Sequence, residues 1–204
     1  MNRVDPLEFL SQNDFKMAKL IKSIGNYSIE LHSDPFESLL KSIIYQQLSG
    51  KSANAIYKKL LNYHDGKIPS PDQIISTSSE TYRNSIGLSL RKVEYIKDLS
   101  LKVSSKKIDL SILPRLADEE IISELVQVKG IGRWTAEMFL IFNLGRLDVM
   151  PLNDLGVRKA IKKLYDLPDL PNITQIQEIS SKWKPYRSIA TWYLWKSLNF
   201  DTIG

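Results

Sequence analysis

The chain has no cysteine and only two histidines, His32 and His64, among its 204 residues. The lack of cysteine excludes disulfides, thiolate zinc sites, cysteine nucleophiles and cysteine-ligated iron–sulfur clusters. With only two histidines, the sequence offers few candidates for a histidine metal site or a serine–histidine triad. No apolar run reaches the length of a membrane span, and the N-terminus does not resemble a secretory signal, so we expect a soluble intracellular protein.

The charge balance is mildly basic, with 28 lysines and arginines against 23 acidic residues and a formal net charge of +5. This excess favours polyanionic partners but does not by itself identify nucleic acid. A hydrophobic content of 43% is enough for a sizeable core. A chain of this length fits one large domain or two small lobes that share an interface.

Apolar residues recur at helical spacing through most of the chain, which predicts an all-α protein of about ten short helices. In the first long helix, Asp34 is the expected N-cap, Pro35 lies in the first turn, and Ser49-Gly50 marks the end. The other predicted helices lie near residues 53–63, 90–103, 118–126, 133–144, 154–165, 174–182 and 185–200, and residues 69–72 mark the start of one more. Strand-type alternation is limited to short pieces such as residues 107–110.

A turn with two glycines joins the predicted helices at 118–126 and 133–144. Gly130 and Gly132 flank Ile131, which we expect to turn inward and anchor the turn to the core. Glycine permits a positive φ and close approach of another backbone. The N–H groups that open the following helix, with Lys129 and Arg133 beside them, predict a binding site for backbone phosphate.

The whole string Val-Lys-Gly-Ile-Gly-Arg-Trp-Thr-Ala, residues 128–136, resembles the hairpin of the helix–hairpin–helix DNA glycosylase superfamily. Members of that superfamily carry an aspartate after a Pro-rich loop about twenty residues further on, and Asp154 matches it. Residues 46–49 (Gln-Gln-Leu-Ser) and 183–188 (Trp-Lys-Pro-Tyr-Arg-Ser) extend the resemblance over about residues 35–198. The alkyl-base branch, the type II 3-methyladenine DNA glycosylases, is the most similar. The N-terminal β-domain of its bacterial prototype would not fit in the roughly thirty residues before Pro35.

The resemblance implies two helical lobes with an active-site cleft between them. One lobe would span residues 34–145 and contain the helix–hairpin–helix at about 118–144. The other would combine residues 1–33 with residues 146–204 and carry Asp154.

The implied activity is that of a monofunctional DNA glycosylase that flips out alkylated purines and hydrolyses the N-glycosidic bond, which starts base excision repair. The expected substrates are of the 3-methyladenine and 7-methylguanine class. Such bases already carry a positive charge and leave without a proton donor, so a single carboxylate suffices.

Asp154 would stabilise the oxocarbenium-like sugar and align a water. It could also be a plain helix N-cap, and both roles can coexist. Asp148 is a lesser candidate, expected to form hydrogen bonds within the loop.

Trp134 and Trp195 match pocket tryptophans of the superfamily, where an electron-poor base stacks on indole. Met138 stands where relatives carry an aromatic residue, which leaves the substrate range open. Members that also cut the strand have a lysine at the position of Trp134, so the resemblance implies that this chain has no lyase activity.

The implied partner is double-stranded DNA that contains alkylated bases, bound by a monomer in the cytoplasm of a prokaryote or the nucleus of a eukaryote. Gln47 is the expected wedge that fills the space left by the flipped base. The other expected DNA contacts are Ser49, Lys51, Lys129, Gly130, Ile131, Gly132, Arg133 and Thr135.

No cofactor is required by this chemistry. The resemblance implies a structural Na⁺ or K⁺ at the hairpin, held by the main-chain carbonyls of Val126, Val128 and Gly130.

The sequence is also compatible with two other hypotheses about function. One is a non-catalytic helix–hairpin–helix protein that binds DNA, for which the basic turn at residues 87–92 offers a further contact. The other is a glycosylase for oxidised or mismatched bases.

Overall fold

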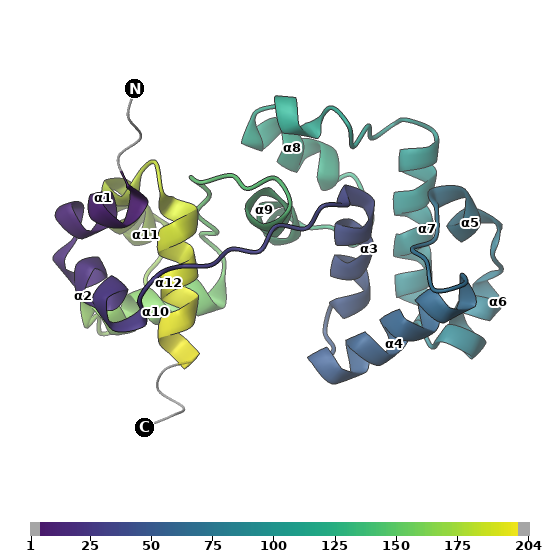
Figure 1. The fold of residues 1–204 in the computed structure, drawn as a ribbon, viewed down its shortest axis with the longest axis horizontal. Coiled ribbons are helices and arrows are strands. Elements are labelled where there is room, and N and C mark those ends of the chain that lie inside the picture. The colour runs from purple at the N-terminus through teal and green to yellow at the C-terminus, as the bar shows by residue number, and fades with distance from the viewer. Residues whose placement is uncertain (1–4, 200–204) are drawn as a thin grey trace. The chain divides into compact units, whose positions relative to one another are not determined.

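The computed structural model describes residues 5–199, and the regular secondary structure in this range is entirely helical, with no β-strand (Figure 1). The segment 107–110, which has strand-type alternation, is a bend and turn. Within the described range, no helix is both long and apolar enough to cross a bilayer. The α-helices are α1 (Pro6–Asn13), α2 (Phe15–Ile24), α3 (Pro35–Tyr45), α4 (Gly50–Tyr63), α5 (Pro71–Ser76), α6 (Ser79–Thr81), α7 (Leu90–Ser104), α8 (Asp118–Leu125), α9 (Arg133–Phe142), α10 (Leu155–Tyr165), α11 (Ile173–Ser180) and α12 (Arg187–Asn199).

The chain forms two compact units. The first combines Met1–Leu31 with Leu140–Gly204, and the second is His32–Phe139. The predicted division placed residues 140–145 in the second unit. The structure assigns them to the first, where Phe142 stacks on Trp195 with ring centroids 5.9 Å apart and Gly145 lies against Leu31.

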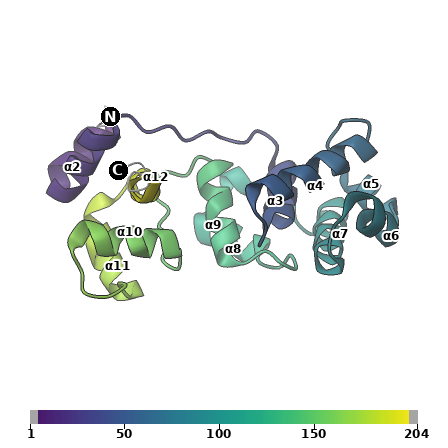
Figure 2. The same cartoon turned by 90° about the horizontal axis from the view of Figure 1, so that it is seen from below.

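The core of the first unit is built by α1, α2 and α10 to α12. Figure 2 labels α2, α10, α11 and α12. α12 packs against both α10 and α2, and α1 packs against α2. Trp183 and Tyr193 are the largest fully buried side chains here. Each such side chain contributes about 2–3 kcal/mol through removal of apolar surface from water. The buried members are Leu10, Met17, Met150, Val157, Ala160, Ile161, Ile176, Trp183, Tyr186, Ile189, Ala190, Tyr193 and Leu194.

The second unit has its own core, centred on α3 and α7. These two helices pack against each other, α3 also packs against α4, and α7 packs against α5. Ile43 of α3 and Ile96 of α7 are fully buried. The hairpin turn between α8 and α9 contributes Ile131, only 4% exposed, so the expected inward anchor of the turn is confirmed.

Local sequence explains why most helices begin where they do. Asp34, Ser49 and Asp154 each accept a main-chain N–H from three residues ahead, so each is the N-cap of α3, α4 or α10. The sequence predicted that Ser49 ends the first long helix, but it begins the next one. α3 stops at Tyr45, because Gln46 leaves the helical region with a ψ of 131°. The next residue, Gln47, has a left-handed φ of +57°.

Candidate functional site

Asp154 is fixed at the start of α10 in the first unit. Its Oδ1 accepts a hydrogen bond from the Val157 main-chain N–H at 2.7 Å and from the Trp195 indole Nε1–H at 3.0 Å. The residue is 9% exposed. The predicted N-cap role is therefore present, and a second donor from α12 fixes the direction of the carboxylate as well.

Gly156 makes this arrangement sterically feasible. A Cβ atom at this position would lie 3.0 Å from Asp154 Oδ1 and 3.2 Å from Trp195 Cδ1. Both distances are shorter than ordinary van der Waals contact, so a larger residue would push the carboxylate and the indole apart. The sequence did not single out Gly156. Its φ is not in the left-handed region, and the need for glycine comes only from its neighbours in the fold, Asp154 and Trp195.

The loop that leads to Asp154 is tied to the start of α12. Asp148 accepts hydrogen bonds from Arg187 Nε at 2.7 Å and from Arg187 Nη2 at 2.9 Å. The Ser188 hydroxyl accepts from the Val149 N–H and donates to the Arg146 carbonyl. Asp148 is thus engaged in a structural ion pair with Arg187.

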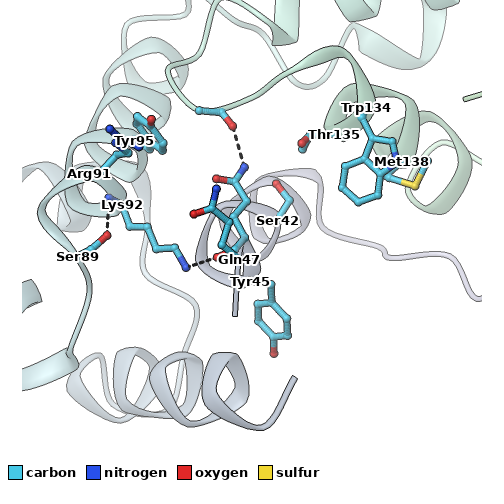
Figure 3. Close-up of a pocket in the computed structure, with 12 residues that line it drawn as sticks. Ser42, Tyr45, Gln47, Ser89, Arg91, Lys92, Tyr95, Trp134, Thr135 and Met138 are labelled. Atoms are coloured by element: carbon cyan, nitrogen blue, oxygen red, sulfur yellow. Dashed lines mark hydrogen bonds between the residues drawn. The ribbon is translucent and has the colours of Figure 1, made fainter. Parts of the chain in front are cut away.

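One cavity of about 540 Å³ in the second unit is lined by some of the predicted DNA-binding and base-pocket residues, namely Gln47, Gly130, Trp134, Thr135 and Met138 (Figure 3). Trp134 and Met138 form one wall from α9, and Trp134 is 49% exposed. Gln47 borders the same cavity from the turn after α3. The full lining is Ser42, Tyr45, Gln46, Gln47, Ser89, Arg91, Lys92, Tyr95, Gly130, Trp134, Thr135 and Met138. Trp195, the other predicted pocket tryptophan, belongs to the first unit and contacts Asp154.

The hairpin turn has the predicted glycine conformation. Gly130 has a φ of +83°, and a Cβ there would lie 2.1 Å from a carbon of the Tyr95 ring. The residue must therefore be glycine for two reasons, backbone conformation and contact with an aromatic face. Tyr95 was missed by sequence reasoning. The signal was its position three residues after Lys92 on α7, which places both side chains on one helical face.

Both cations at the hairpin are paired with carboxylates. Lys129 Nζ lies 2.5 Å from Glu94 Oε1, and this contact raises the pKa of Lys129. Arg133 contacts Glu119 and also Glu137, with Nε 3.1 Å from Oε1 of the latter. The Lys129 main-chain N–H donates to Asp98. These ion pairs compete with any phosphate for the two side chains.

The remaining predicted DNA contacts lie at element ends. Ser49 and Lys51 are exposed at the start of α4. Thr135 is buried on α9, with 8% of its surface exposed. Three further lining residues, Ser89, Arg91 and Lys92, come from the start of α7 and belong to the basic turn that the sequence offered as an additional contact.

Comparison with known proteins gives concordant matches. Residues 40–185 match the family model described as "HhH-GPD superfamily base excision DNA repair protein". The chain is 39% identical over 194 residues to DNA-3-methyladenine glycosylase 1 of Schizosaccharomyces pombe, a match that covers 92% of this chain and 84% of the relative.

Solved structures agree. The S. pombe 3-methyladenine DNA glycosylase Mag1 in complex with abasic DNA aligns with a TM-score of 0.84 and 37% identity, over 95% of this chain and 96% of that one. A DNA-3-methyladenine glycosidase from Bacillus halodurans aligns with a TM-score of 0.86 and 34% identity, over 95% of this chain and 89% of that one. The sequence resemblance is thus confirmed, and the chain belongs to the HhH-GPD superfamily of base excision DNA repair proteins.

Proposed function

We propose that this protein is a monofunctional DNA glycosylase that releases alkylated purines of the 3-methyladenine and 7-methylguanine class by hydrolysis of the N-glycosidic bond. The observation that carries the proposal is the single carboxylate of Asp154, fixed by the Val157 N–H and the Trp195 indole at the position where the superfamily has its aspartate. The relatives named as 3-methyladenine glycosylases, and the one bound to abasic DNA, support the substrate class.

One carboxylate is chemically sufficient for this substrate class. A base alkylated at N3 or N7 carries a positive charge, so the C1′–N bond breaks without a proton donor on the base. Positive charge then develops on the sugar, and the Asp154 carboxylate stabilises it electrostatically. Water adds to C1′, and its proton passes to the same carboxylate as general base.

The indoles supply selectivity for a cationic base. A positively charged ring stacks more strongly on the electron-rich face of tryptophan than a neutral base does. Trp134, half exposed at the cavity wall, and Trp195, beside Asp154, are the proposed stacking residues. Met138 adds a polarisable side chain next to Trp134 in the lining.

DNA is bound by the hairpin and the turn after α3. The main-chain N–H groups around Gly130 and Gly132 bind backbone phosphate, together with Lys129 and Arg133 once these leave their carboxylate partners. Gln47, exposed at the turn, enters the stack in place of the extruded nucleotide. One hairpin and one carboxylate per chain suffice, so the protein acts as a monomer.

We also infer that the hairpin holds a monovalent cation through the carbonyls of Val126, Val128 and Gly130. Oxygen donors of this kind suit Na⁺ or K⁺. The Val128 carbonyl accepts one hydrogen bond from the Ile131 N–H, and the Gly130 carbonyl one from Gln46. Each carbonyl oxygen has a second lone pair, so the set fits a cation. When bound, the cation would attract a DNA phosphate. Exchange of K⁺ for tetramethylammonium at constant ionic strength should weaken DNA binding.

The function is tested by incubation of the protein with methylated duplex DNA and chromatography of released bases. We expect free 3-methyladenine or 7-methylguanine from the wild type. Asp154→Asn should retain the helix cap, since asparagine caps as well as aspartate, but lose at least about 100-fold in rate. Its affinity for DNA should be unchanged.

Asp34→Asn is the matched control, because Asp34 is the same kind of cap at the start of α3. It should release base at the wild-type rate. Retained excision by Asp154→Asn would refute the catalytic assignment. Release of oxidised bases alone, or binding with no release, would support the two other readings. Trapping of a covalent DNA adduct with borohydride would contradict the absence of lyase activity.

A further inference from the structure

The turn between α3 and α4 is held in an unfavourable conformation. Gln47 has a φ of +57°, in the left-handed region that is unfavourable for a non-glycine residue. Its side chain is exposed at the rim of the cavity. Such a conformation persists only where surrounding contacts enforce it.

Lys92 of α7 supplies the first of these contacts. Its ammonium donates hydrogen bonds to the Ile44 carbonyl at 2.5 Å and to the Gln46 carbonyl at 2.8 Å. Figure 3 shows the Lys92 side chain reaching toward the turn after α3. The last carbonyls of a helix have no intrahelical partner, and a cation at this end also interacts favourably with the helix dipole. Lys92 thus ends α3 and fixes the main chain on the N-terminal side of Gln47.

Gln46 supplies the second contact. Its side-chain Nε2 donates to the Gly130 carbonyl at 2.8 Å (Figure 3). The residue before Gln47 is therefore bound through its carbonyl to α7 and through its side chain to the hairpin. Together the two contacts fix the turn relative to the hairpin within the second unit.

We propose that Lys92 is a positioning residue for base extrusion: its ammonium holds the turn in the conformation from which Gln47 enters the DNA stack. This inference rests on the proposed function, and it assigns Lys92 a role other than the phosphate contact that a lysine in a basic turn would ordinarily have. Two of the three ammonium N–H donors are already engaged with main-chain carbonyls. Loss of the ammonium would release the turn and leave Gln47 free to relax from its left-handed conformation.

The experiment uses the full chain and a duplex with a tetrahydrofuran abasic site next to 2-aminopurine, whose fluorescence rises when the neighbouring stack is opened. We compare the wild type with Lys92→Met, Lys92→Arg, Gln47→Ala and the double variant Lys92→Met/Gln47→Ala. Lys58→Met, an exposed lysine on α4, controls for the loss of one positive charge.

We expect Lys92→Met to lose most of the fluorescence rise, about as much as Gln47→Ala. The double variant should lose no more than either single variant, because both changes act on one event. Lys92→Arg should retain most of the response, and Lys58→Met all of it. The slope of log affinity against log salt should be the same for Lys92→Met and Lys58→Met.

A wild-type fluorescence response in Lys92→Met would overturn the inference. So would a salt slope lowered by about one only in Lys92→Met, since that slope counts phosphate contacts. If Lys92→Met is not folded by circular dichroism, Gln46→Met tests the second contact. It should lose part of the same response, and a full response would likewise overturn the inference.

Failure of the proposed function is distinguishable from failure of this inference. If the wild type releases no methylated base but the fluorescence results hold, the positioning role of Lys92 stands and the enzymatic function fails. If base is released but the fluorescence of Lys92→Met is that of the wild type, only the role of Lys92 fails.

Discussion

The Oδ1 atom of Asp154 accepts two hydrogen bonds, one from its own helix and one from Trp195, 41 residues further along the chain. A helix cap alone would fix only the start of α10. The indole donor adds a second constraint on the direction in which the carboxylate points, so at the scale of single residues the site depends on neighbours of Asp154 as much as on Asp154 itself.

Gly156→Ala tests this dependence. Alanine is favoured over glycine in a helix by roughly 0.5–1 kcal/mol, and this gain offsets part of the cost of the close contacts, so the free energy of unfolding should change by less than about 1 kcal/mol. The new Cβ would disturb the contact between Asp154 and Trp195, and the rate of base release should fall roughly tenfold. Gly50→Ala in α4, where a Cβ would meet nothing within 4 Å, should leave the rate unchanged. An unchanged rate in Gly156→Ala would show that base release does not depend on the exact position of the Asp154 carboxylate.

A second buried carboxylate, Asp14, connects elements of the first unit. It is 4% exposed and N-caps α2. Its Oδ2 accepts from the Tyr165 hydroxyl and, at 2.8 Å, from Trp183 Nε1. Burial opposes ionisation, but the hydrogen bonds from Tyr165, Trp183, the Met17 main chain and Lys182 together outweigh it, so the pKa of Asp14 is lowered.

This lowered pKa predicts a pH dependence of stability. A carboxyl whose pKa is lower in the folded than in the unfolded state stabilises the fold fully above the unfolded value, about 4. That contribution is lost as the pH falls from about 4 through the folded pKa. Urea unfolding between pH 7 and pH 2.5 should therefore show a weaker loss of stability at the acidic end in Asp14→Asn than in the wild type. If the free energy of unfolding falls equally with pH in both proteins, the lowered pKa of Asp14 is contradicted.

At the scale of elements, the hairpin between α8 and α9 differs at its two glycines. Gly130 requires a positive φ and lies against the Tyr95 ring, whereas a Cβ at Gly132 would meet nothing within 4 Å. Gly130→Ala should therefore lower the free energy of unfolding by about 2 kcal/mol or more, from backbone strain and overpacking. Gly132→Ala should change it by less than about 1 kcal/mol. Equal effects of the two substitutions on the free energy of unfolding would show that the Tyr95 ring can move away from residue 130 without loss of stability.

At the scale of the whole molecule, the formal charge of +5 overstates the charge available to DNA at the hairpin, because Lys129 and Arg133 are paired with Glu94 and Glu119. These carboxylates weaken the attraction between the hairpin and phosphate. In the proposed function, Lys129 and Arg133 exchange these ion pairs for phosphate contacts when DNA binds. We expect such an exchange to limit the non-specific affinity for undamaged DNA.

Glu119→Gln should raise the affinity for undamaged duplex about two- to fivefold at low salt, with the difference lost at high salt because such interactions are screened. Titration of a fluorescent duplex at several salt concentrations measures this effect. Glu80→Gln on α6 makes the same change of charge at a side chain that pairs with Asn84 and not with a hairpin cation. An equal gain in both variants would mean that net charge, and not the Arg133 ion pair, sets the affinity.

Several features were predictable because their causes are local. The start of α10 at Asp154 follows from a side chain that caps an N–H three residues ahead, and the buried Ile131 follows from its place between two turn glycines. The end of α3 was not predictable. Leu48 continues the helical spacing of apolar residues, yet it is 39% exposed, beyond the end of the helix.

The sequence by itself therefore determined the helical elements, the hairpin, the position of the acid and the family, since each is encoded within a few neighbouring residues. Only the tertiary structure decided where α3 ends, why residue 130 must be glycine and what orients Asp154. Those outcomes depend on Lys92, Tyr95 and Trp195, which lie between 35 and 48 positions from the atoms they contact. Contacts over such separations are set by how helices pack, and helical periodicity carries no information about them.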